Sequence, residues 1–145
     1  MKVRDVLKTK GPKVVTIEAD ATLRSALSRI CEDKVGGLLV LNRAGKLEGI
    51  ITERDIMRQV HQRADLNQVK VVDAMTKEVK VASPSADIEE VEFAMTEGRF
   101  RHMPVMDGDE LVGVISIGDM VKANLHQVKR HMENLMDYMA VPLVE

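Results

Sequence analysis

The sequence contains few of the residues that several common functions require. It has one cysteine, no tryptophan, one tyrosine and two phenylalanines among 145 residues. A single cysteine excludes an internal disulfide framework, and so few aromatic rings give little support to a surface on which nucleic-acid bases stack. The cysteine, Cys31, is predicted to be a small buried residue of a helix rather than a nucleophile.

Neither sign of charge dominates, and no apolar run is long. The 21 basic residues are matched by 23 acidic ones, so the broad positive surface of a nucleic-acid-binding protein is not indicated. No apolar stretch approaches the roughly 20 residues of a membrane-spanning helix, and the amino terminus lacks the core of a signal peptide. We therefore expect a cytoplasmic protein with no nucleic-acid partner and no membrane partner.

The chain does contain an internal repeat. Gly49–Asp55 reads as glycine, two β-branched apolar residues, a hydroxyl residue, two variable residues and aspartate, and Gly113–Asp119 repeats this pattern 64 positions later (113 − 49). Farther upstream, Lys34–Val40 aligns with Arg99–Val105 at an offset of 65 (99 − 34). Such a repeat predicts two similar halves, and therefore two similar sites.

Each half is expected to run strand, helix, strand, turn, strand, helix. The predicted strands are Val14–Ile17, Gly37–Leu41 and Leu47–Ile51 in the first half and Val79–Ala82, Met103–Met106 and Leu111–Ile115 in the second. After the first strand of each half, apolar residues recur at helical spacing, with Asp20 and Ser85 as expected N-caps. Turn-forming clusters at 42–45 and 107–109 predict hairpins.

The two halves are expected to share a core, because about sixty residues would be marginal alone. The predicted boundaries are 1–66 for the first repeat, 67–122 for the second repeat and 123–145 for a C-terminal helical extension with a short tail. Gly49 and Gly113 lie inside the third strand of their halves. A glycine at such a place predicts a bulge or the close approach of another segment.

The hydroxyl and carboxylate of the repeated motif, Thr52 with Asp55 and Ser116 with Asp119, follow a strand and open a helix. One interpretation is a helix cap, in which the hydroxyl accepts from a backbone N–H and the acid closes back. The other is a nucleotide site, because a helix N-terminus offers unpaired N–H groups to an anion and a carboxylate accepts from both hydroxyls of a ribose. The spacing alone favours the cap, and the two roles are compatible.

The second half carries two residues that a cap does not need. Arg101 and His102 stand at the start of a strand; arginine suits phosphate through its forked donors, and histidine donates according to its protonation. The simpler interpretation is a surface charge and a partly buried strand residue. The first half has Gly36 and Gly37 at these positions, where ligand atoms could approach the backbone, and Arg54 within its motif. The two sites are expected to differ in ligand preference.

On these residues the chain resembles a tandem pair of cystathionine-β-synthase (CBS) domains, or Bateman module, and in particular the bacterial stand-alone CBS-pair proteins. The likeness runs from Val3 to Val121 and includes the motif in both halves. It implies an α/β (α+β) fold of two pseudo-twofold-related β-α-β-β-α repeats packed through their sheets, here with an extended C-terminal helix. It also implies that clefts between the repeats bind adenine-containing ligands such as AMP, ATP, NAD or NADH, or S-adenosylmethionine.

The resemblance assigns a role to particular positions. Asp55 and Asp119 would hold ribose hydroxyls, and Thr52 and Ser116 would contact ribose or phosphate. The other ligand-binding residues that it implies are Arg54, Arg101 and His102 toward phosphates, Val15, Thr16, Lys80 and Val81 along the adenine slot, Ile51 and Ile115 closing that slot, and Gly36, Gly37 and Pro104 beside them. No metal ligand, catalytic residue or catalytic cofactor is predicted.

The segment after the repeat has its own pattern. Six apolar residues are spaced 4, 3, 4, 3 and 4 apart, namely Val121, Leu125, Val128, Met132, Leu135 and Met139. This is the seam of a heptad helix, expected to run from Asp119 to Ala140 and to end before Pro142. The helix could pack back on its own domain, but we favour pairing with a second subunit in a homodimer.

The leading hypothesis is a non-catalytic, nucleotide-sensing regulatory module that acts on an unidentified protein partner. An enzyme is less well supported, because no paired nucleophile and base appears at recognisable spacing. A structural or interaction module with vestigial sites, dimerising through its C-terminal helix, is the main alternative. Nucleic-acid binding through Lys122, Lys129 and Arg130 is the weakest hypothesis, because acidic residues lie nearby.

Overall fold

The structure, a computed structural model, describes residues 1–140 of the chain. Its strands are β1 (Thr16–Glu18), β2 (Gly37–Leu41), β3 (Leu47–Thr52), β4 (His102–Asp107) and β5 (Glu110–Ser116). Its helices are α1 (Val3–Lys10), α2 (Leu23–Asp33), α3 (Glu53–His61), α4 (Val71–Ala74), α5 (Ile88–Gly98) and α6 (Ile117–Ala140). This is the mixed α and β fold that the repeat predicted.

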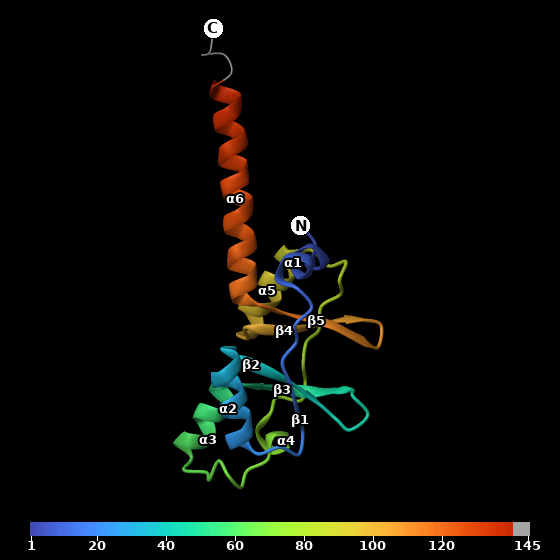
Figure 1. Ribbon diagram of the computed structural model, residues 1–145, viewed down its shortest axis with the longest axis vertical. Coiled ribbons are helices and arrows are strands. Elements are labelled where there is room, and N and C mark those ends of the chain that lie inside the picture. The colour runs from blue at the N-terminus through green and yellow to red at the C-terminus, as the bar shows by residue number, and fades with distance from the viewer. Residues whose placement is uncertain (141–145) are drawn as a thin grey trace.

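The strands form two small sheets that face each other, with helices on their outer sides (Figure 1). In the first sheet, β1 pairs in parallel with β2, and β2 pairs antiparallel with β3. In the second sheet, β4 and β5 pair antiparallel. Both hairpins turn at a glycine with positive φ, Gly45 at 79° and Gly108 at 62°, so the two predicted turns are confirmed.

The predicted strand Val79–Ala82 is wrong, because only Ala82 pairs with the second sheet. Its N–H donates to Pro104 O at 2.9 Å, and its carbonyl accepts from Met106 N at 2.9 Å. Six residues earlier, Thr76 exchanges two backbone hydrogen bonds with Ile50 of the first repeat, at 2.9 and 3.0 Å. The residues in between cross from one repeat to the other, so they cannot lie along β4.

Three further predictions on the first helix of each repeat need correction. The N-caps are Thr22 and Asp87, each two residues beyond the predicted Asp20 and Ser85. Thr22 directly precedes the first buried apolar residue of α2, and its hydroxyl accepts from Ser25 N at 3.2 Å. Cys31 is exposed rather than buried, because the buried face of α2 passes through Leu23, Ala26 and Ile30 instead.

Each repeat completes its core with the segment that precedes the other repeat. Val3 and Val6 of α1 lie in one core with residues of the second repeat, such as Ile88 and Ile115. Val71 of α4 lies in the other core, with residues of the first repeat. Because of this exchange, neither repeat has a complete core without the segment that precedes the other repeat.

A smaller apolar layer lies between the two sheets. Side chains alternate faces along a strand, so Leu39 and Ile50 point away from Leu38 and Ile51, which belong to the core of the first repeat. Leu39 and Ile50 are nevertheless buried, as is Pro104 of β4. Their burial fits the face-to-face packing of the sheets in Figure 1.

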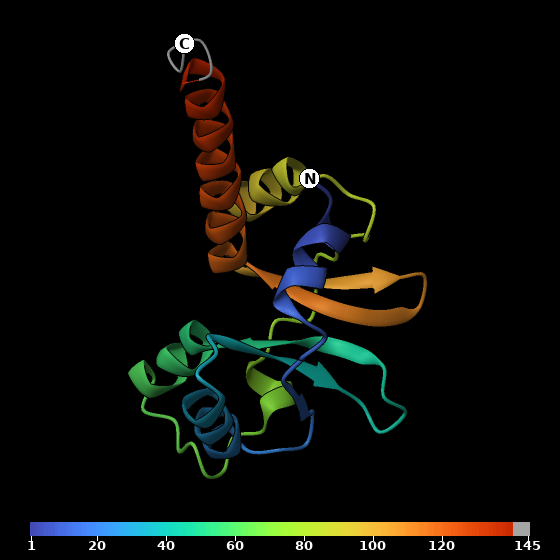
Figure 2. The same ribbon diagram turned by 45° about the horizontal axis from the view of Figure 1, so that its top comes forward.

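Helix α6 leaves the body of the molecule and projects away from it (Figure 2). It is continuous over 24 residues, as predicted, and Met120 near its start is its one buried residue within the described chain. All six seam residues are 52–64% exposed, so the seam does not pack on its own domain. Pro142 lies outside the described residues. None of the helices described within residues 1–140 is both long and apolar enough to cross a membrane.

The strand glycines generate a stability prediction. A Cβ on Gly49 would lie 2.5 Å from the backbone oxygen of Thr76, whereas a Cβ on Gly113 would meet the flexible end of Leu7 at 2.9 Å. A carbonyl fixed by hydrogen bonds cannot move aside as a side chain can. We expect Gly49→Ala to destabilise the protein by about 3 kcal/mol and Gly113→Ala by about 1 kcal/mol. Urea denaturation measures both, and an equal loss in the two variants would contradict this account.

Candidate functional site

The two repeated motifs form the same structure at the point where a strand passes into a helix. At the start of α3, the Asp55 carboxylate accepts from Thr52 N at 2.9 Å and from Thr52 Oγ1 at 3.1 Å, while Asp55 N donates to Thr52 Oγ1 at 3.4 Å. At the start of α6, Asp119 Oδ2 accepts from Ser116 N at 2.8 Å, and Asp119 N donates to Ser116 Oγ at 3.2 Å. Both motifs are therefore capping boxes.

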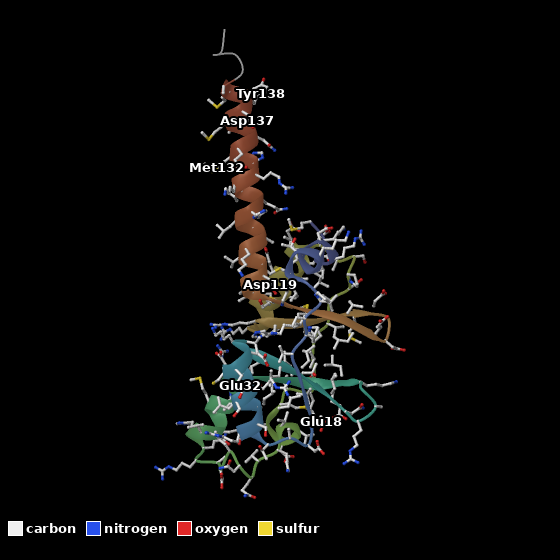
Figure 3. The ribbon with its side chains drawn as sticks, in the orientation of Figure 1. Glu18, Glu32, Asp119, Met132, Asp137 and Tyr138 are labelled. Carbon is white, nitrogen blue, oxygen red and sulfur yellow. The ribbon has the colours of Figure 1, made fainter. Side chains whose placement is uncertain are left out.

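Asp119 has an additional partner that sequence reasoning missed. Lys10, the last residue of α1, donates from Nζ to Asp119 Oδ2 at 2.7 Å and to Val114 O at 2.8 Å. Figure 3 shows Asp119 at the base of α6. The two side chains are 27% and 16% exposed, so this ion pair is partly withdrawn from water. Nothing in the local sequence indicates the pair, because 109 positions separate the residues.

The pKa of Asp119 reflects this setting. Burial raises the pKa of this carboxyl group, but the hydrogen bonds from Lys10 and Ser116 outweigh that effect and hold the pKa below its usual value. Asp119 is therefore a carboxylate at neutral pH. Within residues 1–140, the hydrogen bonds that the Asp119 carboxylate accepts all fall on Oδ2. The carboxylate is therefore held in place, and neither of these donors binds Oδ1.

Asp55 has a different electrostatic environment. It is almost fully buried, with 6% of the residue exposed. Its ion pair is with Arg58 of the same helix, whose Nη1 lies 3.5 Å from Asp55 Oδ1 and whose side chain is 64% exposed. A loose pair with an exposed arginine adds little energy, so among residues 1–140 the carboxylate of the first repeat has no firm cationic partner.

The start of each central strand is bound to the helix of its own motif, and the two strand starts also lie close to each other. Glu53 N donates to Gly36 O at 3.1 Å, and Ile117 N donates to Arg101 O at 2.9 Å, which supports the predicted equivalence of Gly36 and Arg101. The ring of His102 lies against Gly36, since a Cβ there would be 3.1 Å from His102 Cε1 and 3.2 Å from Nε2. The space left by the glycine is therefore filled by a histidine of the other repeat.

His102 lies among charged groups of both repeats. Burial lowers the pKa of its imidazole, and the positive charges of Lys10 and Arg101 add to this effect, while Glu53 and Asp119 oppose it. The net result is a pKa below the ordinary value, so the ring favours its neutral form. A neutral ring that can donate and accept therefore lies at the contact between the repeats, where it is subject to the charges of Lys10 and Asp119.

The other predicted site residues fall into two groups by burial. Ile51 and Ile115 are fully buried in the two cores, and Pro104 is buried between the sheets. The remaining predicted residues lie at or near the surface: Arg54, Lys80, Val81 and Arg101 are exposed, and Val15, Thr16, Gly36 and Gly37 are partly buried. The exposed arginines are free to approach an anion, whereas the two isoleucines pack in the cores and hold the backbone of the site in position.

An open groove of about 960 Å³ lies between α1 and α6 beside the second motif. Lys10 and Asp119 are part of its wall, and Lys122 and His126 continue that wall along α6. The groove gives solvent and small molecules access to Asp119. Its chemistry suits an anionic ligand with hydroxyl groups, because ammonium groups bind anions and a carboxylate accepts from hydroxyls.

Comparison with known proteins identifies the family. A sequence model of the CBS domain matches residues 3–62 and 71–126, and the chain belongs to the CBS domain family as a tandem pair. It is 32% identical to the "CBS domain-containing protein CBSX3, mitochondrial" of Arabidopsis thaliana, over 94% of this chain and 70% of that protein.

Solved structures of similar proteins support the same assignment. A CBS-domain containing protein from Agrobacterium tumefaciens is 39% identical and superposes with a TM-score of 0.81, covering 85% of this chain and 92% of that chain. A CBS domain protein from Pyrobaculum aerophilum, solved as a complex with AMP, is 27% identical with a TM-score of 0.74, covering 82% of this chain and 89% of that chain.

The lowered pKa of His102 predicts a pH dependence of stability. The folded state resists protonation of this ring. The contribution of the neutral ring to the stability of the folded protein is therefore complete above the unfolded pKa of about 6.5. It is lost as the pH falls through the lower pKa of the folded state. His102→Gln should flatten the change in melting temperature between about pH 7.5 and pH 5. The matched control is His61→Gln, at an exposed position of α3, which should leave the wild-type slope. An unchanged slope in His102→Gln would contradict the assignment.

Proposed function

We propose that this protein is a regulatory module that senses an adenosine-containing ligand, AMP, ATP or NAD/NADH, and performs no catalysis. The observation that carries the proposal is the duplicated junction of hydroxyl, carboxylate and helix N-terminus, with cationic side chains next to the second copy. A carboxylate fixed in this way can accept from ribose hydroxyls, and the cations can meet phosphate. The AMP complex of a similar CBS domain protein supports an adenine nucleotide as the ligand.

In this proposal, Asp55 and Asp119 hold ribose hydroxyls with Thr52 and Ser116 beside them. The capping role does not compete with this one, because at Asp119 the carboxylate accepts a single capping hydrogen bond, from Ser116 N to Oδ2, which leaves other lone pairs for a ligand. The further ligand-contacting residues are Arg101, His102 and Arg54 for phosphate, Val15, Thr16, Lys80 and Val81 for adenine, and Gly36, Gly37, Pro104, Ile51 and Ile115 as the surrounding frame.

A ligand at this place would act by shifting the relation between the repeats. His102 of the second repeat touches Gly36 of the first, so a phosphate that attracts the ring changes a contact between them. The shift can be only as large as the difference in ligand affinity between the two arrangements. An unidentified protein partner would respond to this change in the arrangement of the repeats. The proposed repeats are residues 1–66 and 67–122, and the extension is 123–145.

A second proposed property is homodimerisation through α6. The observation that favours it is the heptad seam, whose six residues are more than half exposed along a helix that leaves the body. A second copy presents the same spacing and can cover the seam with knobs-into-holes packing. If the ligand sites were vestigial, this pairing would be the main role of the chain.

The first test is a thermal-shift panel of AMP, ADP, ATP, NAD, NADH and S-adenosylmethionine. A ligand at about one hundred times its dissociation constant stabilises the folded state by about 2.7 kcal/mol, which raises the melting temperature by several degrees in a protein of this size. Asp119→Asn should reduce the shift, because a neutral amide accepts more weakly from ribose. No shift with any ligand, in folded and nucleotide-free protein, would contradict the proposal.

Arg101→Ala separates phosphate recognition from ribose recognition. We expect it to weaken AMP by about tenfold and to leave adenosine nearly unchanged, because a charge-assisted hydrogen bond contributes about 1.5 kcal/mol or more. Arg43→Ala is the control, since Arg43 is exposed in the first hairpin turn. Isothermal titration calorimetry measures both affinities, and an equal loss for adenosine and AMP would argue against a phosphate contact.

The dimer is tested by placing charge in the seam. The double variant Leu125→Glu/Leu135→Glu should be a monomer in sedimentation equilibrium at concentrations where the wild type is a dimer, because carboxylates in a heptad seam are costly to bury. Gln127→Glu introduces the same charge at an exposed position outside the seam and should remain dimeric. A monomeric wild type would overturn the proposed dimer.

A further inference from the structure

The ion pair between Lys10 and Asp119 lies where the proposed ligand has to bind. Lys10 Nζ approaches the same carboxylate oxygen that Ser116 N holds, at 2.7 Å, and is also bound to Val114 O. A carboxylate oxygen has two lone pairs, and those of Oδ2 are used by Ser116 N and Lys10 Nζ. A ribose whose two hydroxyls bind both carboxylate oxygens from the groove between α1 and α6 therefore competes with this ammonium group for Oδ2.

Lys10 is placed there by the packing of α1 on the second repeat. Val3 and Val6 are buried in that core, and backbone N–H groups at the start of α1 bind Ala86 O and Pro84 O, each at 2.9 Å. At the other end, Gly11 N closes the helix on Leu7 O at 2.8 Å with a φ of 93°. The backbone of α1 is therefore fixed, and the Lys10 side chain is the part that can move.

The consequence depends on the charge of the ligand. A neutral nucleoside that displaced Lys10 from Asp119 would leave the ammonium without its anion in a partly buried place. A phosphorylated ligand that displaced it would bring oxygen anions within reach of the same side chain. The cost of breaking the ion pair is thus recovered with an anionic ligand alone.

We propose that Lys10 is a specificity-determining residue of the second site. Its ammonium group competes with ribose for Asp119, and the site therefore selects phosphorylated over neutral adenine ligands. The inference rests on the proposed nucleotide-binding function and deepens it. It assigns to α1, which precedes the first repeat, a role in the ligand choice of the second.

The first repeat lacks this device. The start of α4 aligns with that of α1 at an offset of 68 (71 − 3), but α1 continues to Lys10 whereas α4 ends at Ala74, so α4 presents no residue at the helix end that Lys10 occupies. Within residues 1–140, the ion pair of Asp55 is the loose one with Arg58. The selection by charge is therefore confined to the second site, and the two sites differ in ligand preference for this reason.

The experiment is calorimetric titration of the full chain with adenosine and with AMP. The variants are Lys10→Met, which removes the charge at similar length, Lys10→Arg, which keeps it, and Lys8→Met, which removes an exposed charge of the same helix. We expect Lys10→Met to bind adenosine about three- to fivefold more tightly and AMP more weakly by a similar factor, as for an ion pair of up to about 1 kcal/mol. Lys10→Arg and Lys8→Met should keep the wild-type preference.

The gain in adenosine affinity distinguishes this role from a simple phosphate contact, which would weaken AMP and leave adenosine unchanged. Lack of that gain in Lys10→Met, loss of the preference in Lys10→Arg, or an equal effect in Lys8→Met would each overturn the role of Lys10. Wild-type protein that binds neither ligand would overturn the proposed function itself, and the role of Lys10 with it. Melting curves of all variants establish that they are folded.

Discussion

The exchange of leading segments between the two repeats is the constraint on which the rest of the structure depends. Val3 and Val6, from the start of the chain, complete the core of the second repeat, and Val71, from between the repeats, completes the core of the first. Halves of this size bury too little apolar surface alone. The exchange makes them one cooperative unit, and it brings the exchanged segments close to Gly49 and Gly113, where an added Cβ would lie 2.5 Å from Thr76 O and 2.9 Å from the Leu7 side chain.

The same exchange gives the two candidate sites their difference. Helix α1 delivers Lys10 to Asp119, whereas the shorter helix α4 before the second repeat ends at Ala74 and delivers no such residue. The repeats also meet unequally, because His102 fills the space that Gly36 leaves open. Two copies of one motif thus have the same backbone frame and different electrostatics. A regulatory module gains from such inequality, because two sites of unlike preference can respond to different ligands.

The capping boxes allow a structural role and the proposed binding role to share one set of atoms. The carboxylate accepts from the N–H of the residue just before its own helix, Thr52 or Ser116, and a fixed carboxylate loses little entropy when it accepts from a ligand. The cap therefore prepares the site in advance. Sequence spacing could not separate the two interpretations, and the geometry shows that they need not be separated.

Much of the architecture followed from the sequence alone, because a repeat with hydrophobic periodicity determines which elements form and in what order. The central hairpin strands, the glycine turns, the continuous final helix and the capping of each motif were all predictable from short-range patterns. The failed predictions concern features that depend on how distant parts of the chain pack together. The strand expected before Ala82 is replaced by a crossing between repeats, and Cys31 lies on the outer face of its helix. The Lys10–Asp119 pair and the contact of His102 with Gly36 join residues far apart in the chain, so only tertiary packing could decide them.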